Sequence, residues 1–163
     1  MKKILLFPLI LIALSITLFP QPKNVTDIFN KYRGKEGFTS IDLTDPSAMF
    51  SEVTIKGEKQ QLKNILEKTK GIKILSYSKK DKSTGLGKEF ENDLKNILPI
   101  EGYKEFLSVN EDGKLVKMMN KKGNKDESNE FLLIVAGDEE SVLIWIQGNI
   151  TPNDLDKLDK IFK

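Results

Sequence analysis

The sequence has 163 residues, enough for one domain with a hydrophobic core, and its 39% hydrophobic and 31% charged residues are typical of a globular protein. These proportions argue against a disordered chain and against a polytopic membrane protein. Lys2 and Lys3 account for the formal net charge of +2, so the rest of the chain carries equal numbers of basic and acidic residues. A neutral body has no electrostatic footprint for binding nucleic acid.

The first 22 residues have the pattern of an export signal. Lys2 and Lys3 precede an apolar run over residues 4–19, which is slightly short for a membrane-spanning helix. No clean pair of small residues marks a cleavage site before Lys23, so an uncleaved anchor is the alternative. We expect residues 1–22 to be a signal peptide or N-terminal membrane anchor and residues 23–163 to form a single α+β domain. Because the sequence contains no cysteine, it has no lipobox, and we expect an exported periplasmic or cell-envelope protein that is not a lipoprotein.

The first half of the domain mixes helical and strand patterns. Apolar residues at helical spacing predict a helix that is capped by Asn24, Thr26 or Asp27 and ends before Gly34, and alternation over residues 38–43 predicts a strand. The same signals predict, in order, a short helix opening at Asp45-Pro46-Ser47, a helix over 58–70 that ends at Gly71, a strand over 72–77 and a helix over 86–98.

The second half is dominated by strands. Residues 103–109 and 114–120 predict a hairpin around Asp112-Gly113, because an Asp-Gly pair favours a tight hairpin turn. Residues 131–136 and 142–146 predict a second hairpin, whose turn over 137–141 is rich in polar residues. A last helix follows Gly148, with Thr151 as its cap and Pro152 at its first position.

The second hairpin is the densest apolar stretch of the domain. Both of its arms are apolar at successive positions, so each strand presents apolar side chains to both faces of its sheet and is predicted to be central. Consecutive hairpins predict a mostly antiparallel sheet with helices packed on one face, an α+β fold. The other face must be covered by something else or stay partly exposed.

Four stretches together resemble the DUF4252 family: the apolar leader, residues 27–44 (DIFNKYRGKEGFTSIDLT), the EGYKEFLSV strand with its hairpin, and the closing EFLLIVAGDEESVLIWIQGNI. Asn149 stands where the Gly-Asp-Ile ending of the family has Asp. The resemblance implies an exported protein of Bacteroidota with no assigned function, and the genomic neighbourhood of the family suggests a link to envelope signalling. It carries over no catalytic residue.

Catalytic chemistry is restricted because histidine and cysteine are both absent. This excludes Ser-His-Asp and Cys-His nucleophilic sites and every metal site built on imidazole or thiolate. Asp42 with Asp45 is a possible carboxylate pair, and residues 138–140 resemble a calcium cluster, although a turn residue and a charged hairpin tip explain them better. Gly85, Gly87 and Lys88 lack the spacing of a phosphate-binding loop. No catalytic, metal or cofactor-binding residue is assigned, and a carboxylate-based hydrolase is the weakest alternative.

Binding residues are therefore sought on the second hairpin. Leu143, Trp145, Phe131 and Leu133 are the candidate partner- or ligand-binding residues, with a tryptophan of the core as the competing interpretation of Trp145. The sequence favours a non-catalytic interaction or sensing module that binds an unknown envelope protein. The alternative is a carrier or sensor of an apolar small ligand or lipid. Contact with the membrane is expected only through an uncleaved N-terminal segment.

Overall fold

A computed structural model describes residues 21–46, 59–79, 85–124, 128–151 and 154. The order of its elements matches the predicted one. The helices and strands within these ranges are α1 (Val25–Tyr32), β1 (Phe38–Thr44), α3 (Lys59–Glu67), β2 (Thr69–Ser78), α4 (Gly85–Asn96), β3 (Lys104–Glu111), β4 (Lys114–Lys121), β5 (Asn129–Ala136) and β6 (Glu140–Gly148).

The strands form one six-stranded sheet in the order β1-β2-β6-β5-β4-β3, and every neighbouring pair is antiparallel. β5 and β6, the arms of the predicted second hairpin, occupy the two central places of the sheet. The turn between β3 and β4 has positive φ at both Asp112 (49°) and Gly113 (78°), as the Asp-Gly pair predicts. The prediction of an antiparallel sheet with a central C-terminal hairpin is confirmed.

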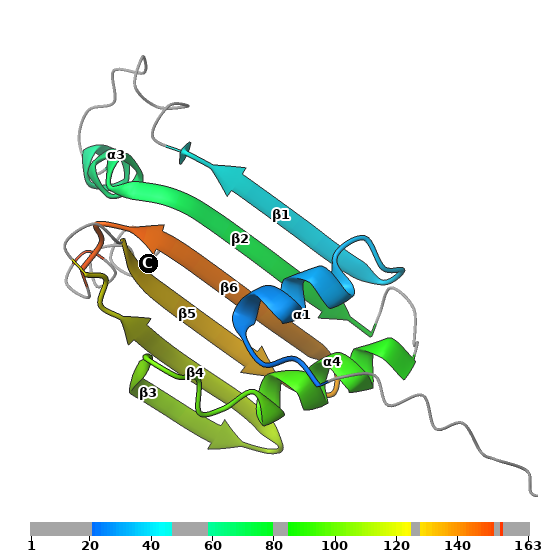
Figure 1. Cartoon of the computed structure of the whole chain (residues 1–163). Helices are drawn as coiled ribbons and strands as arrows, with labels where there is room; N and C mark the ends of the chain where they lie inside the picture. Colours follow the sequence, from blue (N-terminus) through cyan, green and yellow to red (C-terminus); the bar gives the residue numbers. More distant parts are fainter. Residues whose placement is uncertain (1–20, 47–58, 80–84, 125–127, 152–153, 155–163) are drawn as a thin grey trace, which may run out of the picture.

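Two helices, α1 and α4, lie against one face of this sheet (Figure 1). Among the described residues, fifteen are buried in the core between the layers, and all the strand residues in this set come from this face by register. They are Val25, Ile28, Phe29, Tyr32, Leu75, Tyr77, Phe90, Leu94, Ile97, Ile100, Met119, Leu132, Ile134, Ala136 and Leu143. The predicted α+β class, with helices packed on one face, is confirmed.

α1 begins and packs as its sequence predicts. The Asn24 side chain accepts a hydrogen bond from the Asp27 backbone N–H at 2.9 Å, which is the bond of a helix cap. The apolar stripe of α1 enters the core, and Tyr32 is fully buried at its end. The Tyr32 hydroxyl donates to Asp93 Oδ2 of α4 at 2.6 Å. This buried bond fastens the two helices to each other above the sheet.

The predicted end of the third helix at Gly71 is wrong. α3 ends at Glu67, and Gly71 lies within β2, where it pairs with Gln147. The reason is a close backbone contact that local patterns do not reveal. A Cβ on Gly148 would lie 2.3 Å from the Lys68 carbonyl oxygen, and the Asn149 N–H donates to that same oxygen at 2.8 Å. The end of β6 thus holds the start of β2 in the sheet.

Two predicted helices fall largely outside the described residues, namely the one opening at Asp45-Pro46-Ser47 and the one after Gly148. Within the described part, the Thr151 N–H and hydroxyl both donate to Asp154 Oδ2, at 2.9 and 2.7 Å. These bonds tie Thr151, the residue predicted to cap the last helix, to Asp154, and the rest of that predicted helix lies outside the described residues. The apolar leader at residues 4–19 also lies outside the described ranges. Among the helices that are described, none has the length and hydropathy needed to cross a bilayer.

Candidate functional site

The four candidate binding residues divide between the two faces of the sheet. Leu143 is opposite Ile134, and Trp145 is opposite Leu132, so both side chains belong to the helix-covered face. Leu143 is buried in the core, and Trp145 is half-buried against it. Phe131 and Leu133 lie on the other face of β5.

We call this second face the open face, because the core beneath α1 and α4 takes no residue from it. Its apolar residues come from all six strands and follow from the register of the strand pairs. They are Ile41, Leu43, Ile72, Ile74, Leu107, Val109, Val116, Met118, Phe131, Leu133, Val135, Val142, Ile144 and Ile146. The sheet therefore has two apolar faces, as the pattern of its central strands predicts.

Exposure is greatest at the two edges of the open face. Ile41 is 41% exposed on β1, and Val109 is 43% exposed on β3. The residues of the central strands are half-buried, as expected for side chains that neighbouring strands flank on both sides. Phe131 is the exception, because it is buried at the end of the sheet where α3 lies. Leu43, Ile72 and Ile146, which lie in the same row as Phe131, are not buried, so the open face is accessible along its length except at Phe131 itself.

Charged residues on the open face are confined to the ends of strands. Those that the register places there are Lys104 and Glu111 at the two ends of β3, and Lys114 and Glu140 at the first positions of β4 and β6. Two are basic and two are acidic. The middle of the face is therefore apolar and uncharged, and its rim carries a balanced pair of each sign.

On the helix-covered face, Trp145 belongs to a polar cluster around Glu130. The Trp145 Nε1–H donates to Glu130 Oε2 at 2.7 Å, and the Tyr103 hydroxyl donates to the same oxygen. Lys121 approaches the other carboxylate oxygen at 3.4 Å. Burial, together with the bond to Glu130, raises the pKa of the Tyr103 phenol. Trp145 also lies against the Phe29 ring, at 6.2 Å between centroids, so its environment is that of a residue at the margin of the core.

A hollow of about 760 Å³ opens beside this cluster, between the start of α1, the segment before β3 and the sheet. Its charged lining consists of Lys23, Lys121, Glu101 and Glu130. An apolar ligand in this hollow would displace water from these charged groups and offer them no hydrogen bonds in return, which is unfavourable. The hollow is therefore poorly suited to the apolar ligand of the carrier hypothesis.

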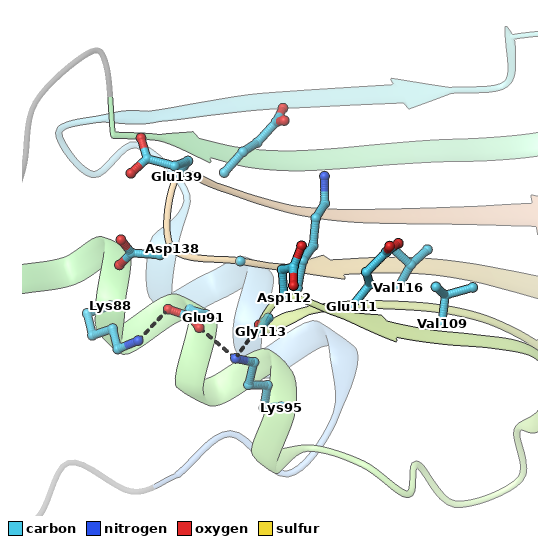
Figure 2. Close-up of a pocket in the computed structure, with 13 residues that line it drawn as sticks. Lys88, Glu91, Lys95, Val109, Glu111, Asp112, Gly113, Val116, Asp138 and Glu139 are labelled. Atoms are coloured by element: carbon cyan, nitrogen blue, oxygen red, sulfur yellow. Dashed lines mark hydrogen bonds and ion pairs between the residues drawn. The ribbon is translucent and has the colours of Figure 1, made fainter.

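A second hollow, of about 680 Å³, lies at the hairpin tips (Figure 2). In it, the buried Glu91 carboxylate lies between Lys88 Nζ at 2.8 Å and Lys95 Nζ at 2.6 Å. Burial opposes ionisation of Glu91, but the hydrogen bonds from these lysines outweigh it and lower the pKa. Asp138 and Glu139 both accept from Lys79, at 3.0 and 2.9 Å. The acidic tip is thus joined to the end of β2, as expected for a charged turn.

Asp42 and Asp45, the possible carboxylate pair, lie in different environments and make different contacts. Asp42 lies between the cations of Arg33 and Lys73, each 3.5 Å from Oδ2. Asp45 has a left-handed backbone, with φ of 49°, and its N–H donates to the Lys70 carbonyl at 2.8 Å. This is the turn role of Asp45 that the sequence favours over a catalytic one. In the ranges that the structure describes, no group of three acidic side chains has the arrangement of a metal site.

The cluster around Glu130 is a feature that the sequence reasoning missed. Its signal was the alternation of β5, in which Glu130 shares a face with Leu132 and Ile134. An acidic residue in line with core positions of a central strand indicates a polar partner above the sheet. Tyr103 lies just before β3, far from Glu130 in the sequence, so no local sequence pattern predicts that the two side chains meet.

Residues 32–158 match the model of a family described as Domain of unknown function (DUF4252). Comparison with the curated proteins and with the solved structures found no match. The matched range takes in the whole described sheet and includes the Gly148-Asn149-Ile150 ending, where Gly148 packs against Lys68 and Ile150 is buried. That ending thus has a structural reason in the contact between β6 and the start of β2. The chain belongs to the DUF4252 family.

Proposed function

We propose that this chain is a non-catalytic binding module of the bacterial cell envelope, which binds a protein through the open face of its sheet. The observation that carries the proposal is an apolar face that extends across six strands and has no charged residue in its middle. Soluble monomers rarely expose a continuous apolar surface of this extent unless it binds something. A link to envelope signalling is the role that fits an exported member of this family.

The arrangement of the face supports a protein partner. An apolar centre inside a polar rim is the usual anatomy of a protein interface. The face is broad and follows a sheet, whereas a small ligand is normally enclosed in a pocket that buries most of its surface. The hollow beside Trp145 has the volume for a small molecule, but its lining is charged. Because of its volume, this hollow keeps the carrier of a small ligand as the second candidate function. Its charged lining matches a polar ligand better than an apolar one.

The test uses two neighbouring positions on the edge strand β3. Val109 belongs to the open face, and Asn110 belongs to the opposite side, and both are exposed. The tagged full chain, its V109K variant and its N110K variant are each cross-linked in envelopes of the native host and captured. Mass spectrometry then identifies the attached proteins.

The proposal predicts one or more proteins that are captured by the wild-type chain and by N110K but lost with V109K, because a lysine on the open face places an unpaired charge in the interface. If no captured protein depends on Val109, the open face is not the binding surface. Native mass spectrometry of the same samples for a bound lipid then tests the carrier hypothesis.

A further inference from the structure

The open face has the shape and chemistry of one half of a sheet-on-sheet interface. Its side chains are mostly β-branched or leucine, and they project from a sheet whose neighbouring strands are all antiparallel. Two such sheets pack face to face about 10 Å apart, with apolar side chains interdigitated between them. A second sheet of the same kind would cover this face as α1 and α4 cover the other.

We propose that the partner of the open face is a second copy of this chain, so that two protomers pack sheet against sheet around a twofold axis. This inference rests on the proposed function, because it names the protein that occupies the same surface. The contact is isologous, meaning that each copy contributes the same residues. The dimer would have four layers, with helices outside and two sheets within.

The area of the face is sufficient for a stable dimer. Six strands spaced about 4.8 Å apart, with about seven paired residues each, give a face of about 700 Å². Without the end where Phe131 is already buried, about 500 Å² remains. Two copies would together bury about 1,000 to 1,400 Å², which reaches the range of specific protein interfaces.

Charge distinguishes a second copy from a membrane surface. The rim carries two lysines and two glutamates, Lys104, Lys114, Glu111 and Glu140, and the middle carries no charge. A face that binds anionic lipid is flanked by an excess of basic residues, which is not found on this rim. When two copies of this face pack together, no charged residues oppose each other in the centre. At the rim, each copy contributes both lysines and glutamates.

The test measures the mass of the purified full chain by sedimentation from low to high protein concentration. The interface variant carries I41K and V109K, at the two most accessible edges of the open face, where a lysine is tolerated in a free protomer. The control variant carries S40K and N110K, the neighbouring positions on the same strands and the opposite face. Circular dichroism and thermal unfolding check that both variants are folded.

A dimer in the wild type and the control, with a dimer dissociation constant raised about 100-fold or more in the interface variant, supports the proposal. If both variants weaken the dimer equally, the dimer forms through the strand edges. If neither variant weakens it, the dimer forms through another surface. Either result overturns the proposal. A wild-type monomer at every concentration also overturns it. In that case the proposed function still stands if capture from envelopes depends on Val109, and it fails as well if capture does not.

Discussion

The two faces of one sheet are equally apolar in sequence but differ in what covers them. Beneath α1 and α4, residues such as Leu143 and Ile134 are completely buried, and a buried hydrogen bond from Tyr32 to Asp93 locks the helices above them. On the open face, Ile144 remains half-buried and Val109 exposed. The difference teaches that apolarity of a strand predicts that both faces will be covered, but does not predict that the helices of the described residues will cover both.

The comparison is tested most strongly by truncating adjacent residues of β6. Leu143→Ala removes a side chain from the packed core and should lower the free energy of unfolding by about 3 to 4 kcal/mol. Ile144→Ala acts on the open face and should cost about 1 to 2 kcal/mol in the free protomer, because its side chain already contacts water. Urea unfolding at low protein concentration measures both. Equal losses would mean that the open face is covered within the monomer.

A smaller effect is expected from the bond that fastens the helices on the covered face. Tyr32→Phe removes the bond to the buried Asp93 carboxylate but keeps the one from Lys31, at 2.7 Å, and should cost about 1 to 2 kcal/mol. Urea unfolding of this variant, of Asp93→Asn and of the double variant gives the coupling between the two side chains. The absence of any coupling would show that the Tyr32–Asp93 bond does not help to hold α1 on α4.

Acid should loosen the contact between Asp154 and the segment that leads into β2. Burial opposes ionisation of Asp154, but hydrogen bonds from Thr151 and Lys68 outweigh it and lower the pKa to about 2. Because the folded pKa is the lower one, the unfolded chain takes up the proton first. The stabilisation is complete near neutral pH, decreases as pH falls below about 5 and is lost at about 2.

The measurement for Asp154 is urea unfolding of the wild type and of Asp154→Asn as a function of pH. At pH 7 the variant should be about 1 kcal/mol less stable, because it loses the ion pair with Lys68 and weakens the hydrogen bonds from Thr151. The difference between the two proteins should shrink below about pH 5 and disappear as the pH falls toward 2. A difference that stays constant with pH would contradict the assignment of this stabilisation to the carboxylate.

The smallest effect is expected at the polar margin of the covered face. Trp145→Phe keeps an aromatic ring beside Phe29 but removes the N–H that donates to Glu130. Since Tyr103 and Lys121 still contact that carboxylate, the loss should be about 1 kcal/mol by urea unfolding followed by circular dichroism. A loss as large as that of Leu143→Ala would mean that Trp145 is a central core residue rather than a residue at the margin of the covered face.

The sequence by itself determined the order of the elements, the central place of β5 and β6 and the apolar character of both sheet faces. These features follow from periodicity and from the Asp112-Gly113 turn, each of which acts between residues close together in the chain, whereas the structure selected Asn24 among the three possible caps of α1. Only the tertiary structure decided that α3 ends at Glu67, because the contact of Gly148 with Lys68 joins distant segments. It also placed Leu143 and Trp145 under the helices and brought Tyr103 to Glu130, since register and helix packing depend on the whole sheet.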